Sequence, residues 1–269
     1  MRLELILNTT DKNRITIPVN YQYPISAWIY KTIEEGNHAF ASFLHNKGFS
    51  SGTKSYKLFT FSQLRFPARG FKVEGDRLMI LSGECKITLS FMVPEAVENF
   101  ITGLFKNQKF TLGDQITQAL LIVSSVEVIP EPSFNTKTSF RCLSPVIIAK
   151  KTEEGHSAEY LAPEHHDFER ILFENLIHKY SASVSSGLFK SGREAMSEDQ
   201  VMLFKLLNTP RKWGVTIKDR TLQQTKIIGY TFDFYIEAPV ELISIGFSCG
   251  FGEKNALGMG CVDCLSGKF

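Results

Sequence analysis

The segment that most constrains this chain is a glycine-rich stretch at residues 246–260, which reads GFSCGFGEKNALGMG. Five of its fifteen residues are glycine. Its backbone can therefore reach positive φ at several positions and let another chain approach closely. Successive N–H groups in such a loop can point into one concavity that holds phosphate oxygens, and Lys254 adds a positive charge. The stretch indicates a loop that binds a phosphate backbone.

Two known phosphate-binding motifs do not fit this stretch. A dinucleotide fingerprint needs Gly-x-Gly-x-x-Gly between a strand and a helix, but after Gly250 and Gly252 the third position is Asn255. A P-loop needs Gly-Lys-Ser or Gly-Lys-Thr, and the chain contains neither. The remaining alternative without a ligand is a glycine-rich hairpin between two C-terminal strands.

Composition limits the class of protein. A length of 269 residues suits one large domain or two of moderate size. The net charge of +2 means that affinity for a polyanion must come from a local patch. An odd count of five cysteines fits a reduced, cytoplasmic chain, and Cys261-x-x-Cys264 lacks the second ligand pair of a structural zinc site, so we interpret both as core residues. Neither a membrane span nor a secretory signal is expected.

The first half of the chain predicts strands and helices in a mixed order. Alternating polar and apolar residues at 2–7 indicate a half-buried strand. A helix is expected from Pro24 to Gly36, with Asn37 capping a second short helix. The elements expected after these are strands at 58–61, 77–81 and 86–92, a helix at 94–105 and a strand at 119–128.

A similar pattern follows residues 130–138, which resemble a linker because of Pro130 and Pro132. The second half predicts a strand at 140–149, a helix at 166–180, a loop at 184–197 and then strands to the end. We therefore predict an α+β fold of two tandem ferredoxin-like (RRM-like) domains, residues 1–130 and 131–269, with a C-terminal Gly-rich loop. The RNA-recognition relatives of this plan make nucleic acid a natural ligand.

These features together resemble one family. The residues that carry the likeness are the glycine-rich ending, the Leu143-Ser144-Pro145 turn, the segment 23–30, His45 and the segment 58–60. The chain resembles the CRISPR-associated repeat-RNA endoribonucleases, the Cas6 family of the RAMP superfamily. The resemblance covers essentially the whole chain. It implies two ferredoxin-like domains and metal-independent cleavage of precursor CRISPR RNA within the repeat, without a cofactor, giving 2′,3′-cyclic phosphate and 5′-OH ends.

The resemblance also implies a Tyr/His/Lys set, matched here by Tyr30, His45 and Lys57. The reaction needs a group that takes the 2′-OH proton, a group that gives a proton to the leaving 5′-oxygen, and a charge that stabilises the phosphorane. His45 lies off the apolar stripe of its helix and near the helix C-terminus, which favours imidazolium, so it suits a general acid. Tyr30 is also off its stripe and suits positioning of the 2′-hydroxyl, because a phenol with a pKa of ~10 is a poor base.

Two of these assignments have competitors. The connection after His45 is long, so Lys47 and Lys54 compete with Lys57 for the transition-state charge. His38 is a second histidine candidate, but it follows the expected cap, where a helix N-terminus disfavours a cation. The other histidines are interpreted as surface residues: His156, His165, His166 and His178.

RNA binding is expected from the glycine loop and from basic clusters in the second domain. The predicted RNA-binding residues are Gly250, Gly252, Lys254, Gly258, Gly260, Arg211, Lys212, Trp213, Lys190 and Arg193. Trp213 can stack on a base, and the cleft between the domains is expected to hold the repeat. Subunits of a CRISPR effector complex and a second copy of the chain are further candidate partners. The alternatives are a non-catalytic RNA-binding RAMP subunit of an effector complex and a nucleotide-handling enzyme.

Overall fold

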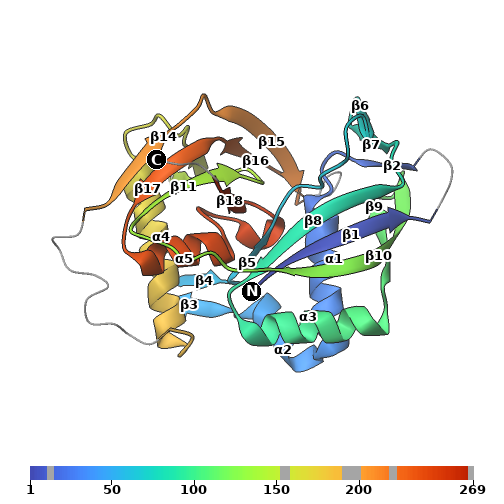
Figure 1. Ribbon diagram of the computed structural model, residues 1–269, viewed down its shortest axis with the longest axis horizontal. Coiled ribbons are helices and arrows are strands. Elements are labelled where there is room, and N and C mark those ends of the chain that lie inside the picture. The colour runs from blue at the N-terminus through green and yellow to red at the C-terminus, as the bar shows by residue number, and fades with distance from the viewer. Residues whose placement is uncertain (11–14, 152–157, 190–200, 218–222, 266–269) are drawn as a thin grey trace.

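The computed structural model describes residues 1–10, 15–151, 158–189, 201–217 and 223–265, which form two α+β domains beside one another (Figure 1). The first domain is built on an antiparallel five-stranded sheet of order β5-β8-β1-β10-β9. Its strands are β1 (Arg2–Thr9), β5 (Phe59–Phe61), β8 (Glu84–Phe91), β9 (Lys109–Gly113) and β10 (Gln118–Ile129).

Alternation along the central strand β1 sets the core of this domain. Leu3, Leu5 and Leu7 are buried, whereas Glu4 and Ile6 between them are half-buried, as the two-residue period of a strand requires. Helices α1 (Gln22–Gly36) and α3 (Pro94–Lys106) pack against each other beside the sheet. The helix predicted at 94–105 is confirmed as α3, and the strand predicted at 119–128 is confirmed as β10.

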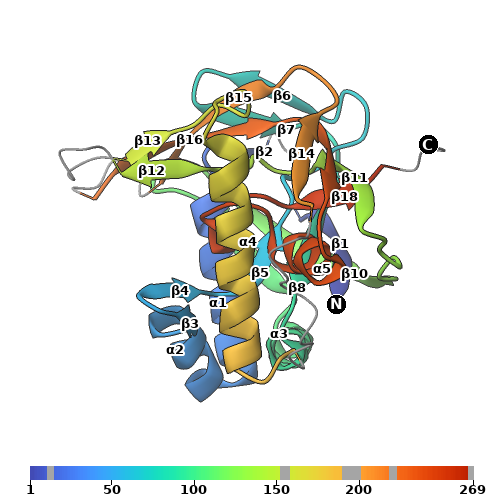
Figure 2. The ribbon, with the colours of Figure 1, turned by 90° about the vertical axis from the view of Figure 1, so that its left-hand side faces the viewer.

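A short second helix follows α1 directly because Asn37 serves both helices. Its N–H donates to the Ile33 carbonyl at the end of α1, 2.8 Å away, and its side chain accepts from the Phe40 N–H at the start of α2 (His38–Asn46), 3.1 Å away. The predicted cap is confirmed. After α2, the hairpin of β3 (Phe49–Ser51) and β4 (Lys54–Tyr56) reaches the second domain and packs on its helix α4 (Phe168–Ser185) (Figure 2).

The second domain has a four-stranded sheet of order β14-β17-β11-β18, with two helices and two hairpins. The sheet strands are β11 (Lys137–Cys142), β14 (Leu203–Leu206), β17 (Asp233–Glu237) and β18 (Val262–Cys264), and the helices are α4 (Phe168–Ser185) and α5 (Val240–Cys249). The hairpins pair β12 (Ala149–Lys151) with β13 (Ala158–Tyr160) and β15 (Arg211–Ile217) with β16 (Thr225–Thr231). A further small sheet of the first domain contains β2 (Ile15–Pro18), β6 (Phe71–Glu74) and β7 (Arg77–Ile80).

Two predictions for the second half were wrong. The chain does not continue in strands to its end, because α5 occupies Val240–Cys249. Seven of its ten residues are buried, and its polar residues Glu241, Ser244 and Ser248 mark only one narrow side, so the short apolar run does not distinguish a helix from a buried strand. The strand expected at 140–149 also ends early, at Cys142, and Val146 makes only an isolated bridge with Tyr230.

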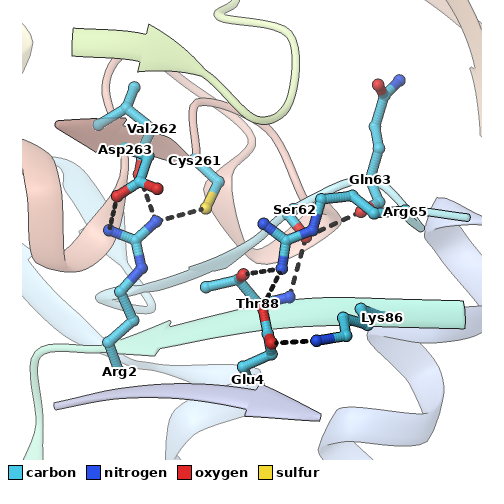
Figure 3. Close-up of polar contacts among 10 residues, drawn as sticks. All are labelled: Arg2, Glu4, Ser62, Gln63, Arg65, Lys86, Thr88, Cys261, Val262 and Asp263. Carbon is cyan, nitrogen blue, oxygen red and sulfur yellow. Dashed lines mark hydrogen bonds and ion pairs between the residues drawn. The ribbon is translucent and has the colours of Figure 1, made fainter. Parts of the chain in front are cut away.

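Polar contacts of β1 join the two domains (Figure 3). The buried guanidinium of Arg2 donates to the Val262 carbonyl on β18 and lies 4.2 Å from the centre of the Phe247 ring on α5. On the neighbouring strand, the Ser90 hydroxyl donates to the Ser248 carbonyl at 2.9 Å. These contacts fix the second domain, and with it the glycine loop, against the first. Within the described residues no helix is long and apolar enough to cross a membrane.

Candidate active site

Tyr30, His45 and Lys57 come from three separate segments and line one cavity of about 690 Å³, here called the Tyr30 cavity. The rings of Tyr30 and His45 meet edge to face, with centroids 5.1 Å apart and planes at 81°. The Lys57 ammonium donates to the His45 main-chain carbonyl at 2.8 Å. The structure therefore brings together the three residues that the sequence predicted as a set.

Tyr30 lies at the edge of the buried face of α1. Its ring is half-buried and packs edge to face on Phe59, with centroids 5.5 Å apart. Burial raises the pKa of the Tyr30 phenol above its ordinary value. The hydroxyl is thus protonated at neutral pH and suits donation or positioning better than proton abstraction.

His45 is exposed in the last turn of α2. Its Nδ1 lies 3.1 Å from the Asn46 side-chain oxygen, and the Asn46 amide nitrogen donates to the Ser42 hydroxyl at 3.2 Å. With the amide oriented in this way, the contact with His45 requires a proton on Nδ1. A second proton on this imidazole would then sit on Nε2, where it could be transferred to a ligand.

Lys57 lies between β4 and β5, immediately before Leu58, whose φ is +52°. Partial burial lowers the pKa of Lys57. Of its two competitors, Lys54 is exposed on β4 and lines a neighbouring cavity, while Lys47 lines neither cavity. Its place at the Tyr30 cavity therefore favours Lys57 as the lysine that stabilises the transition-state charge. One lysine that the sequence analysis did not single out, Lys31 on α1, also lines the Tyr30 cavity.

His38 lines the Tyr30 cavity as well, although it is exposed on the first turn of α2. Its Nδ1 is 2.8 Å from a carboxylate oxygen of Glu34, one helical turn earlier in the sequence. This partner gives His38 a role in a surface ion pair, whereas His45 has no carboxylate partner among the described residues.

The glycine loop, which is residues 250–260 after α5, forms another wall of the Tyr30 cavity through Ala256 and Leu257. Its glycines are buried and allow close packing of the loop on both domains. A Cβ on Gly258 would lie 2.2 Å from the Phe61 ring, and one on Gly252 would lie 2.3 Å from the Ile147 carbonyl oxygen. Glycine is therefore required at these positions by the protein's own packing.

Several N–H groups of the loop are also used inside the protein. Those of Gly250, Gly258 and Gly260 donate to main-chain carbonyls at 2.8–2.9 Å. Lys254, in contrast, is exposed with φ of +59°, and its side chain lines the cavity next to the Tyr30 cavity. Among the predicted phosphate contacts of this loop, the structure leaves the Lys254 ammonium most accessible.

A buried lysine on α4 holds the loop in place, and the sequence analysis missed it. The Lys179 ammonium donates to the carbonyls of Gly250 and Gly252 at 2.6 and 2.7 Å. Burial lowers the pKa of Lys179 to about 8. The sequence does hold a signal, because Lys179 follows Leu172 and Leu176 at helical spacing on the buried face of α4.

The predicted basic clusters lie away from the Tyr30 cavity or outside the described residues. Arg211, Lys212 and Trp213 are exposed at the start of β15 and do not line it. The Trp213 indole N–H donates to the Thr231 hydroxyl at 2.9 Å, so its ring is held at the surface of the hairpin. Lys190 and Arg193 lie outside the described residues.

Among the described residues, one group could offer three metal ligands: His165, His166 and Asp167, whose ligand atoms lie within 4.8 Å of one another. Both histidines precede α4, and their rings stack with centroids 4.2 Å apart. Asp167 already pairs with Arg170 at 2.8 Å and with Lys150 at 3.6 Å. These two cations disfavour a metal ion there.

Family models match both parts of the chain. Residues 129–264 match the model described as "CRISPR associated protein Cas6, C-terminal", which is half of the chain, and residues 16–123 match "CRISPR-associated protein Cas6, N-terminal".

Full-length relatives show the same likeness. The chain is 29% identical to CRISPR-associated endoribonuclease Cas6 1 of Methanocaldococcus jannaschii over 97% of this chain and 92% of the relative. It is 27% identical to CRISPR-associated endoribonuclease Cas6 of Pyrococcus furiosus, over 100% and 91% of the two chains. A putative endoribonuclease-like protein, Cas6nc of Pyrococcus horikoshii, is 23% identical over 98% and 100%.

Solved structures agree with these matches. One described as "CRISPR associated protein Cas6" superposes with a TM-score of 0.74 at 28% identity, over 99% of each chain. A Cas6-related protein from Pyrococcus furiosus gives a TM-score of 0.79 at 21% identity, over 100% of this chain and 99% of that one, which supports the fold alone.

Proposed function

The chain belongs to the Cas6 family of CRISPR-associated endoribonucleases, and from that premise we propose that it cleaves precursor CRISPR RNA within the repeat, without a metal ion. The RNA's own 2′-hydroxyl loses its proton to water and attacks the adjacent phosphorus, and the bond from phosphorus to the 5′-oxygen breaks, which gives 2′,3′-cyclic phosphate and 5′-OH ends. The observation that carries this proposal is the convergence of Tyr30, His45 and Lys57 on one cavity.

Each member of the trio has a chemical part in this proposal. His45 donates a proton to the leaving 5′-oxygen, because it is exposed and can carry its second proton on Nε2. Tyr30 positions the 2′-hydroxyl through a phenol that burial keeps protonated. The Lys57 ammonium stabilises the negative charge that develops on the phosphorane. Its anchor on the His45 carbonyl keeps the ammonium and the imidazole at one site.

The chain path supports a finer description of both domains. In each, the elements follow the order β-α-β-β-α-β, and the four main strands take the spatial order 2-3-1-4: β5-β8-β1-β10 and β14-β17-β11-β18. We propose that both domains are ferredoxin-like, with the boundary between residues 130 and 131. The free cysteines among the described residues support a cytoplasmic site of action.

We propose that the repeat RNA follows the cleft between the domains, where the glycine loop borders the Tyr30 cavity and Lys254 lines the cavity beside it. Arg211 and Lys212 would extend this path as sequence-independent phosphate contacts. Changing both to Glu should weaken repeat binding and reduce its salt dependence, because each lost phosphate contact lowers the slope of log K against log salt by roughly 1. Unchanged affinity and slope would remove them from the interface.

The direct test of the proposed activity is incubation of the protein with repeat-containing RNA in excess EDTA, followed by analysis of the product ends. Cleavage to a cyclic phosphate and a 5′-OH is expected. Binding without cleavage, on the repeat from its own CRISPR locus, would instead favour a non-catalytic RNA-binding subunit of an effector complex. Cleavage that EDTA abolishes would contradict the metal-independent chemistry.

A further inference from the structure

A second cavity, here called the Tyr56 cavity, lies beside the Tyr30 cavity between β4, α4 and the glycine loop, with a volume of about 410 Å³. The two cavities share Lys57, Ala256 and Leu257 in their linings. The two cavities therefore adjoin at these three residues, one of which belongs to the trio. The volume is in the range typical of sites for small organic groups.

Two buried polar atoms at the Tyr56 cavity lack a hydrogen-bond partner. Among the described residues, seven buried side-chain polar atoms have no partner, and two of them are Tyr56 Oη and Asn175 Oδ1. Both residues line this cavity, and Asn175 is only 6% exposed. Because folded proteins normally satisfy buried polar groups, an unpaired hydroxyl and an unpaired amide oxygen at one cavity point to a ligand.

The two atoms differ in what they can recognise. Asn175 Oδ1 accepts an N–H, whereas the Tyr56 hydroxyl can donate a proton, because burial raises the pKa of Tyr56 to about 12. A nucleobase edge presents an N–H donor next to an acceptor nitrogen or oxygen. Lys54, Lys57 and Lys254 also line the cavity and suit the phosphates attached to such a base.

We propose that the Tyr56 cavity holds the base of the nucleotide that adjoins the scissile phosphate, with Asn175 and Tyr56 hydrogen-bonded to the base edge. This inference rests on the proposed function and deepens it, since it assigns a base-recognition site to the same RNA substrate. The lysines at the rim hold the sugar-phosphate backbone, and Lys57 is common to the base site and the trio.

The test measures binding of repeat RNAs, each of which lacks one base. The abasic position is moved along the repeat from one RNA to the next, and every RNA is 2′-deoxy at the attacking nucleotide so that it cannot be cleaved. Wild type is compared with Tyr56→Phe and Asn175→Leu, and Tyr235→Phe on β17 serves as the matched control. Tyr56→Phe removes only an unpaired hydroxyl, so its melting temperature should not fall below that of wild type. It should bind intact RNA roughly 3- to 10-fold more weakly, the loss of one hydrogen bond.

The abasic scan should show coupling at one nucleotide, next to the scissile bond mapped with all-ribose RNA. At that nucleotide the missing base should weaken RNA binding by wild type and Tyr235→Phe about tenfold or more. It should weaken binding by Tyr56→Phe and Asn175→Leu less. Equal sensitivity of all four proteins at every position would overturn the base site. Wild type that binds but never cleaves all-ribose RNA would overturn the proposed activity alone, and absence of any binding would overturn both.

Discussion

Replacing the buried Lys179 by Met tests whether one charged group inside the second domain fixes the glycine loop. Burial lowers the pKa of Lys179 from 10.5 to about 8. At ~1.4 kcal/mol per pKa unit, the proton costs the folded protein about 3 kcal/mol. The two hydrogen bonds to the carbonyls of Gly250 and Gly252 offset this cost, at ~1.5–3 kcal/mol each for a charged donor. We expect Lys179→Met to lower the free energy of unfolding at pH 7 by at most about 3 kcal/mol.

The pH dependence gives a sharper signature than the stability at one pH. Between pH 8 and 10.5 the unfolded chain keeps the Lys179 proton while the folded chain loses it. Stability therefore rises with pH in this window, by at most ~1.4 kcal/mol per pH unit from this site, and the contribution is absent below pH 8. The Met variant lacks this gain.

Urea unfolding at several pH values from 7 to 10 measures the effect. Burial raises the pKa of several tyrosines and cysteines, whose counterparts in the unfolded chain titrate in the same range, so the informative quantity is the wild-type free energy of unfolding minus that of the variant. This difference should increase steadily above pH 8. The control is Lys205→Met, on the exposed side of β14, whose difference from wild type should stay constant. A constant difference for Lys179→Met as well would refute the reasoning.

Two further changes test the loop and the trio. Gly258→Ala should lower the free energy of unfolding by roughly 2–4 kcal/mol, because φ is +75° and the added Cβ would overlap the Phe61 ring. Gly52 also has positive φ but lies in open space, so Gly52→Ala should cost only about 1 kcal/mol. Thermal or urea unfolding measures both. Equal losses would contradict the packing role. At saturating protein, Lys57→Met should reduce single-turnover cleavage by roughly 10²–10³-fold, beyond the loss of RNA affinity that it shares with Lys54→Met, and Lys54→Met should cleave within a few-fold of wild type. A larger loss of cleavage for Lys54→Met than for Lys57→Met would assign the transition-state charge to Lys54.

Much of the first domain could be predicted because its signals are local. Asn37 is a residue type that caps helices, and it lies between two apolar helical patterns. Tyr30 and His45 were matched through the family resemblance, with support from their positions off the apolar stripes of their helices, and the structure places both at one cavity. Local signals of this kind need no knowledge of the tertiary fold.

The parts that sequence could not predict depend on contacts between distant segments. Helix α5 is short and largely buried, and its polar residues Glu241, Ser244 and Ser248 form too narrow a stripe to reveal the helical period beside the apolar run. The contact of Lys179 with Gly250 and Gly252 joins α4 to a loop about seventy residues later. The choice among Lys47, Lys54 and Lys57 likewise depends on the β3–β4 hairpin, whose pairing the spacing of polar residues does not specify.

The central claim is that His45 acts in RNA cleavage, and single-turnover cleavage of repeat RNA by His45→Ala tests it most directly. Binding of the same RNA is measured in parallel, and His38→Ala serves as a matched control, since His38 lines the same cavity but pairs with Glu34. We expect His45→Ala to bind normally and cleave roughly 10²–10⁴-fold more slowly, with His38→Ala close to wild type. Cleavage by His45→Ala within a few-fold of wild type would contradict the assignment.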